Sequence, residues 1–135
     1  MIGILLVTHG QIGPSLVGAA EYILGRQEGL SAVTVDSADL PLSAKRIKAA
    51  ITAMGCPDGT VILTDMYGGT PSNASLPFLD DENIEIVAGV NLPMLMKCLT
   101  SRENITPADL AQRALEGGQR GILVTRMILD TAPPQ

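Results

Sequence analysis

MIGILLVTHG, residues 1–10, opens the chain with an apolar run that turns polar at Thr8. A continuous apolar run such as residues 2–7 is typical of a β-strand that is buried on both faces, as in parallel sheets covered by helices. Apolar residues then recur at helical spacing over 16–24, and Gly25 marks the end of this predicted helix. A strand followed by a helix is the repeating unit of an α/β domain.

The same alternation continues along the chain. It predicts further strands at 31–35, 61–64, 84–87 and 122–124, and further helices at 47–54, 70–77, 91–99 and 106–117. We therefore expect one α/β domain over residues 1–129, with a mainly parallel open sheet flanked by helices on both faces. Residues 130–135, which end in Ala-Pro-Pro-Gln, are expected to form a flexible C-terminal tail.

Helix boundaries follow from capping residues. Thr70, Asn91 and Thr106 each precede a proline by one or two positions, which predicts that each is an N-cap. Pro77 comes early in the predicted third helix, so this helix is expected to end or kink there. The Gly-Gly pair at 117–118 predicts the end of the last helix.

Composition narrows the class of protein. The chain has 135 residues, is 46% hydrophobic and 17% charged, and is therefore expected to be globular. A net charge of −5 with only 2% aromatic residues disfavours nucleic-acid binding. No apolar stretch is long enough to span a membrane and the N-terminus lacks the basic region of a signal peptide, which predicts a cytoplasmic protein. Cys56 and Cys98 form no CxxC motif and are expected to be thiols in a reducing compartment.

Two polar side chains each follow a predicted strand, and these two strands could be neighbours in the sheet. His9 comes after the first predicted strand and Asp65 after the third, and ligands of open α/β sheets bind at these carboxyl ends. His9 is the only histidine, and Gly10 leaves its ring uncrowded. A neutral imidazole is a good nucleophile toward phosphorus, and a carboxylate on its other nitrogen fixes the tautomer and stabilises the developing charge. The pair predicts a phosphoryl-transfer site with His9 and Asp65 as its catalytic residues.

The segment after Asp65 offers groups for a phosphoryl oxygen. Gly68 and Gly69 lead into a predicted helix start, where backbone N–H groups are unpaired, and the Thr70 hydroxyl can add a hydrogen bond. Spacing alone leaves a second interpretation open, in which His9 is structural and Asp65 only forms a turn. Asp36 and Asp39 follow the second strand, where an acidic residue could serve a site like that of response regulators, but no acidic pair follows the first strand.

Other site classes lack their motifs. The single histidine and separate cysteines match no common zinc pattern, and there is no GxxxxGK[ST], GxGxxG or GxSxG motif. Nothing in the sequence requires a metal or an organic cofactor.

Three motifs resemble the mannose-class IIA (EIIA) domain of the sugar phosphotransferase system. They are Thr-His-Gly at 8–10, Asp-Met-Tyr-Gly-Gly-Thr-Pro-Ser-Asn-Ala at 65–74 and Ala-Gly-Val-Asn-Leu-Pro-Met at 88–94, in the family's order over about residues 1–126. The resemblance implies that His9 accepts phosphate from phospho-HPr and passes it to an EIIB component. It also implies that Asp65 orients His9, that Thr70 matches the family's active-site Ser or Thr, and that the loop containing Asn91 lines the same rim together with Gly10, Gly68 and Gly69.

The resemblance further implies an assembly. Family members carry a parallel four-stranded sheet and a fifth, antiparallel strand, here near 122–125, that is exchanged across a homodimer, which would cover an exposed sheet edge. Membrane contact would be only indirect, through a permease.

Departures from the family keep alternatives open. Met66 stands where the family often has Thr, which removes one hydroxyl from the site. The chain ends at Gln135 without an EIIB domain, so a free-standing regulatory phosphoprotein of an incomplete phosphotransferase system is an alternative. The phosphotransfer subunit of dihydroxyacetone kinase shares the fold but carries an Asp-Met-Gly-Ser type motif, which this chain lacks.

Overall fold

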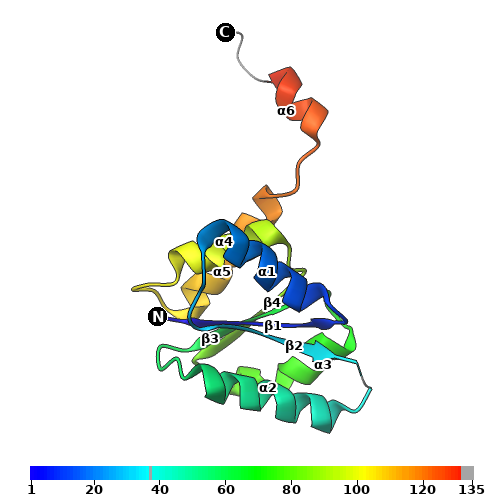
Figure 1. Ribbon diagram of the computed structural model, residues 1–135, viewed down its shortest axis with the longest axis vertical. Coiled ribbons are helices and arrows are strands. Elements are labelled where there is room, and N and C mark those ends of the chain that lie inside the picture. Colours follow the sequence, from blue (N-terminus) through cyan, green and yellow to red (C-terminus); the bar gives the residue numbers. More distant parts are fainter. Residues whose placement is uncertain (37, 132–135) are drawn as a thin grey trace.

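The computed structural model describes residues 1–36 and 38–131, so the predicted tail falls partly on residues 132–135, outside the described residues. Strands and helices alternate along the chain (Figure 1). The strands are β1 (Gly3–His9), β2 (Leu30–Val35), β3 (Thr60–Thr64) and β4 (Ile84–Ala88). The helices are α1 (Ile12–Leu24), α2 (Leu40–Met54), α3 (Thr70–Ser75), the 3-10 helix η1 (Leu76–Asp80), α4 (Leu92–Ser101), α5 (Pro107–Arg120) and α6 (Thr125–Thr131).

The four strands form one parallel sheet in the order β2-β1-β3-β4. β1 is therefore central, and it pairs with β2 on one side and β3 on the other. Val7 lies opposite Thr64, so β1 and β3 end at the same edge of the sheet. The predicted open α/β fold with a parallel sheet is confirmed, and its topology makes the first and third strands neighbours.

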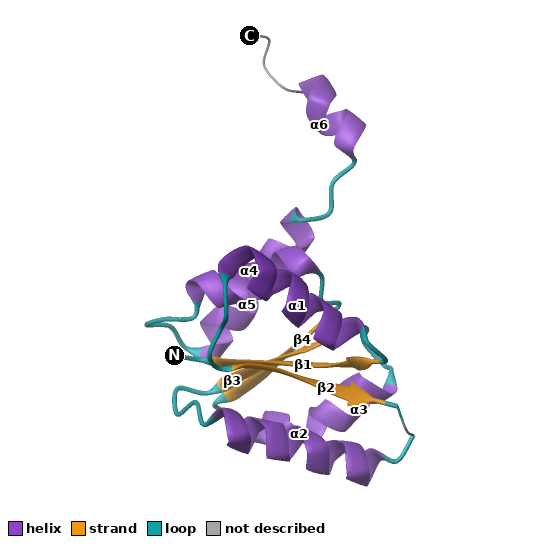
Figure 2. Ribbon diagram, in the orientation of Figure 1, coloured by secondary structure: helices purple, strands orange, loops and turns teal. Residues whose placement is uncertain are grey.

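Helices cover both faces of this sheet, with α1, α4 and α5 on one side and α2 and α3 on the other (Figure 2). The side chains of β1 alternate between the two layers: Ile4 and Leu6 pack under α1, α4 and α5, whereas Leu5 and Val7 pack toward α2 and α3. All four are fully buried. This two-sided burial explains why the first strand is an uninterrupted apolar run. No helix in the described part of the chain is long and apolar enough to cross a membrane.

Two of the three predicted N-caps are confirmed. The Asn91 side chain accepts a hydrogen bond from the Met94 N–H at 2.9 Å, and Thr106 accepts one from the Asp109 N–H at 3.1 Å. The third prediction is wrong by one residue, because Gly69 is the N-cap of α3 and Thr70 is its first helical residue. The expected break near Pro77 is confirmed, since α3 gives way to η1 at Leu76.

The predicted end of the last core helix at Gly117 and Gly118 is wrong, because α5 runs on to Arg120. These glycines instead allow α5 to lie close against α4. A Cβ atom at position 117 would stand 2.7 Å from the Cβ of Lys97, and one at position 118 would stand 2.8 Å from the Cε of Met94. Both distances are shorter than van der Waals contact, so the pair is required by packing rather than by a helix end.

Gly117→Ala is expected to destabilise the protein. The added methyl group would press on the Cβ of Lys97, which is fixed to the α4 backbone, and overpacking of this kind costs about 1–3 kcal/mol. Gly18→Ala is the matched control, since Gly18 also lies within a helix but a Cβ atom there would meet no atom within 4 Å. Both variants gain the helix propensity of alanine. Urea unfolding should show Gly117→Ala less stable than Gly18→Ala, and equal stabilities would contradict the close packing.

The predicted fifth strand is not formed within this chain. Residues 122–124 belong to no described strand, and α6 follows directly at Thr125 and stands apart from the helices that cover the sheet (Figure 1). A β-strand needs a partner for its backbone hydrogen bonds, and this segment has none among the described strands. Its side chains are exposed, at 75% for Ile122, 64% for Leu123 and 62% for Val124. Asp130, predicted to begin the tail, lies inside α6.

Candidate active site

The carboxyl ends of β1 and β3 bring His9 and Asp65 into contact. The Nδ1 atom of His9 lies 2.8 Å from Oδ2 of Asp65, and the backbone N–H of His9 donates to the same oxygen at 2.9 Å. The other carboxylate oxygen, Oδ1, accepts from the Met66 N–H at 3.1 Å. Asp65 therefore holds both the backbone and the ring of His9.

This contact sets the tautomer of the imidazole. Burial on its own raises the pKa of Asp65, but the hydrogen bonds from His9 and the charge of its ring outweigh burial, and the pKa lies below the ordinary aspartate value. Asp65 is thus ionised near neutral pH, and an ionised carboxylate only accepts hydrogen bonds. Nδ1 therefore carries a proton, and in the neutral form of the ring the lone pair is on Nε2. The His9 side chain is 46% exposed, against 10% for Asp65.

Glycines surround the ring and the turn that carries it. Gly10 has φ of +48°, a backbone conformation that favours glycine directly after His9. On the other side, a Cβ atom at position 69 would stand 3.0 Å from Cε1 of His9. The absence of a side chain at Gly69 therefore makes room for the imidazole in its present orientation.

Two threonines hold the turn after β1. The buried Thr8 hydroxyl accepts a hydrogen bond from the Gly13 N–H at 2.7 Å, which ties the end of β1 to the first turn of α1. The Thr34 hydroxyl, on the neighbouring strand β2, donates to the Gly10 carbonyl at 2.8 Å. These two hydrogen bonds hold the residues directly before and after His9.

A hollow of about 390 Å³ opens beside the ring. Its described lining residues are His9, Gly10, Val35, Asp36, Ala38 and Thr70. Thr70, in the first turn of α3, lines this hollow together with His9. Met66 and Tyr67, which follow Asp65 in the chain, are 58% and 80% exposed, so the segment between Asp65 and Thr70 presents apolar surface.

Asn91 follows β4, and each polar atom of its side chain has a structural contact. Its Oδ1 atom caps α4, and its Nδ2 atom donates to the Gly118 carbonyl of α5 at 3.0 Å. It is not among the described residues that line the hollow. Gly68, with φ of +87°, accepts a hydrogen bond from Asn73 through its carbonyl at 3.3 Å, and this contact shapes the turn before α3.

Sequence reasoning missed Thr34 and gave Asp36 a different role. Thr34 is an ordinary strand residue by pattern, and only the pairing of β1 with β2 places its hydroxyl near Gly10. The sequence suggested Asp36 for a site of the response-regulator kind, whereas it lines the hollow beside His9. The signal available in the sequence was its position just after the second strand, at the same edge as His9 and Asp65. Across the described residues, no three His, Cys, Asp or Glu side chains come together as metal ligands.

Comparison with known proteins places this chain in a family. The EIIA-man family, described as "PTS system fructose IIA component", matches residues 3–115. A fructose-specific EIIA component of the phosphotransferase system (PTS) from Bacillus subtilis is 30% identical over 112 residues, which cover 82% of this chain and 77% of the relative. The mannose-specific EIIAB component of Escherichia coli K12 is 33% identical over 124 residues, which cover 90% of this chain.

The chain spans only 38% of the length of that Escherichia coli relative. Among solved structures, the phosphotransferase system component EIIA from Streptococcus agalactiae superposes with a TM-score of 0.84 at 25% identity, over 94% of this chain and 99% of that chain. The match of the family to most of the chain, together with the shared fold, establishes the relationship. The chain belongs to the EIIA-man family, the mannose-class EIIA components of the sugar phosphotransferase system.

Proposed function

We propose that this protein is a phosphocarrier that accepts a phosphoryl group from phospho-HPr on Nε2 of His9 and passes it to an EIIB component. The observation that carries the proposal is the contact between Nδ1 of His9 and Asp65 at 2.8 Å, because it selects the neutral tautomer whose lone pair is on Nε2. The ring is also exposed enough for a partner protein to reach it. We further propose that the protein acts in the cytoplasm and meets the membrane only through a permease.

The transfer step follows from these contacts. The Nε2 lone pair forms a bond to phosphorus while the P–N bond of the donor phosphohistidine breaks, and that electron pair returns to the donor imidazole. The His9 ring becomes positively charged, and the Asp65 carboxylate stabilises this charge. Thr70 and the backbone N–H groups at the start of α3 would bind phosphoryl oxygens. In the second transfer, a nucleophile of the EIIB component attacks the same phosphorus, the P–Nε2 bond breaks, and its electron pair returns to the His9 ring. Positioning and charge stabilisation suffice for such a loose transition state.

The names of the relatives support a role in the phosphotransferase system but do not agree on one sugar. The relatives are called mannose-specific, fructose-specific and sorbose-specific components. All are phosphotransferase system proteins, which agrees with HPr and EIIB as partners. Because sugar names differ among relatives that share this domain, we assign the phosphoryl transfer and not a particular sugar.

Incubation with phosphoenolpyruvate, enzyme I and HPr tests the proposal. We expect the intact mass to increase by one phosphoryl group, and the gain to be lost in acid, as for a phosphohistidine. His9→Ala should give no gain while keeping the fold. Subsequent addition of an EIIB component should remove the group, whereas a purely regulatory phosphoprotein would be labelled but keep it. No gain beside a working HPr control would contradict the proposal.

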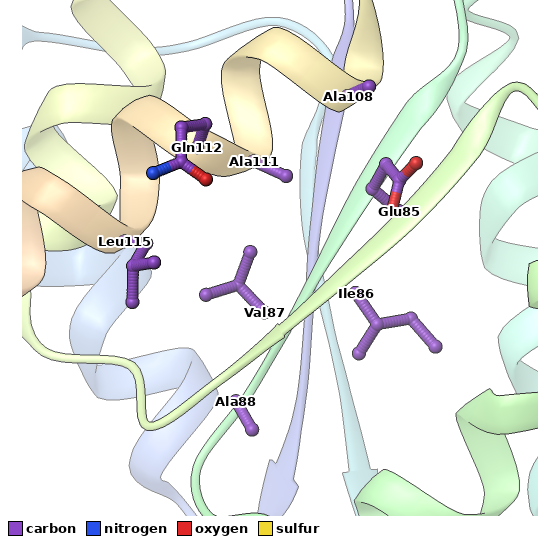
Figure 3. Close-up of a pocket in the computed structure, with 8 residues that line it drawn as sticks. All are labelled: Glu85, Ile86, Val87, Ala88, Ala108, Ala111, Gln112 and Leu115. Atoms are coloured by element: carbon purple, nitrogen blue, oxygen red, sulfur yellow. The ribbon is translucent and has the colours of Figure 1, made fainter.

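We also propose that two copies form a homodimer by exchanging residues 122–124. β4 is an edge strand, and a hollow of about 400 Å³ lies between it and α5. Figure 3 shows Val87 of β4 and Ala111 of α5 on this hollow, with Ile86 pointing to the opposite face of the sheet. An antiparallel strand from a second copy would cover the edge, and the apolar side chains at 122–124 would lose their exposure.

Leu123→Asp is expected to shift the protein from dimer to monomer. A carboxylate buried against the apolar edge of β4 would be unpaired, whereas the same residue is 64% exposed in the isolated chain. Tyr22→Asp is the matched control, since Tyr22 is an exposed residue of α1 at 92%. Light scattering after size exclusion should give a dimer for the parent and the control, and a monomer for Leu123→Asp. A monomeric parent protein would contradict the exchange.

A further inference from the structure

Asp36 brings an acidic residue to the hollow that would receive the phosphoryl group. It lines the hollow together with His9 and Thr70, and Asp65 stands on the far side of the ring. None of the described lining residues is a lysine or an arginine. A phosphoryl group carries a charge of about −1.5 to −2 at neutral pH, so a group on Nε2 would be repelled by Asp36 unless a cation came close.

Arg46 is the cation that pairs with Asp36. It lies in the second turn of α2, and helical side chains lean toward the N-terminus of their helix, which here follows the carboxyl end of β2. Its Nη1 atom is 3.3 Å from Oδ1 of Asp36. The guanidinium is thus held directly beside a residue that lines the hollow.

The pair between Asp36 and Arg46 is free to change partners. The side chains are 69% and 49% exposed, and an exposed single ion pair contributes little to the stability of a fold. A guanidinium binds a phosphoryl group through two parallel hydrogen bonds and prefers a dianion to a single carboxylate. An ion pair of this kind therefore keeps a cation beside a residue that lines the hollow without fixing it in the fold.

We propose that Arg46 binds the phosphoryl group on His9, and that Asp36 holds Arg46 in place while His9 is unphosphorylated. Phosphorylation moves the guanidinium from the Asp36 carboxylate to the phosphoryl oxygens, where it offsets the added negative charge. This role rests on the proposed phosphocarrier function and deepens it. Arg46 then favours the phosphorylated state, whereas Asp36 competes with the phosphoryl group for the same cation.

Substitutions of Arg46 and of Asp36 should consequently shift the phosphorylation equilibrium in opposite directions. Arg46→Gln removes the cation. The equilibrium constant for phosphorylation by phospho-HPr should therefore fall about 5- to 10-fold, the size expected for one charge-assisted contact. Asp36→Asn removes the competitor and a repelling charge, so the same constant should rise about 2- to 5-fold. If the pair only supported the fold, both variants would break the same contact and change phosphorylation in the same direction.

The experiment measures this equilibrium by intact mass in mixtures of phospho-HPr and each variant, at about 50 mM and at about 500 mM salt, since screening weakens exposed charges. Lys48→Gln is the control, because Lys48 is an exposed cation of the same helix. The effect of Arg46→Gln should shrink at high salt, and Lys48→Gln should match the parent. Parent protein that is not phosphorylated at all would overturn the proposed function itself. A labelled parent with Arg46→Gln equal to Lys48→Gln, or with both pair variants shifted the same way, would overturn this role alone.

Discussion

Asp65→Asn is expected to slow phosphorylation of His9 by about 100- to 10,000-fold, the range over which a positioned acid–base partner contributes to catalysis. The Oδ2 atom of Asp65 accepts from both the backbone N–H and Nδ1 of His9. An amide at this position has only one accepting oxygen and no negative charge. The imidazole would lose the fixed tautomer and the stabilisation of its positive charge, while the size of the side chain and the fold stay the same.

The rate of mass gain from phospho-HPr measures this effect. Asp80→Asn is a suitable control, because Asp80 is an exposed aspartate at the end of η1, away from His9 in the sequence and outside the hollow. It should react like the parent protein. Because hydrogen bonds from His9 hold the pKa of Asp65 below its ordinary value, the parent protein should keep this contact throughout the neutral range and lose it only in acid, as the pH falls through that lowered pKa. Parent-like kinetics in Asp65→Asn would refute the role of the carboxylate.

Arg102→Met is expected to lower the free energy of unfolding by about 3–5 kcal/mol, the range for losing several hydrogen bonds to a buried charged group. Arg102 is only 5% exposed and lies at the end of the sheet opposite to His9. Its guanidinium donates to the carbonyls of Ile2, Glu28 and Gly29 and to the side chain of Gln27. These bonds join the start of β1, the segment before β2 and the end of α4.

Methionine preserves the length of the apolar stem but removes the donors of all these hydrogen bonds. Arg113→Met on α5 provides the control, since Arg113 is exposed and its replacement should change stability by less than about 0.5 kcal/mol. Urea unfolding followed by circular dichroism would measure both variants. A loss in Arg102→Met no larger than that in Arg113→Met would contradict the account of Arg102 as a buried link between three segments.

Much of the fold could be predicted because local patterns and tertiary structure agree. The apolar run before His9 predicted a strand buried on both faces, and Leu5 and Leu6 pack into opposite layers. The ends of the first and third strands predicted the contact between His9 and Asp65, because parallel neighbours end at the same edge. These features depend on periodicity and on a general rule of topology.

The remaining features depend on contacts between segments far apart in the sequence. Gly118 was predicted to end a helix, but its lack of a side chain instead lets α5 pack closely against Met94 of α4. Asn91 donates a hydrogen bond to its carbonyl. The contribution of Thr34 to the site depends on the register of β2 against β1. Residues 122–124 have the composition of a strand, yet a strand also needs a partner, and this chain supplies none among its described strands.

The position of the phosphoryl group on His9 tests the central claim most directly. The protein, labelled with ¹⁵N in histidine, would be phosphorylated through phosphoenolpyruvate, enzyme I and HPr and examined by NMR, in which coupling to phosphorus identifies the modified ring nitrogen. Because Asp65 holds Nδ1 at 2.8 Å, we predict phosphorus on Nε2 alone. Phosphorus on Nδ1, or an unmodified His9 beside fully active HPr, would contradict the assignment of His9 as an acceptor oriented by Asp65.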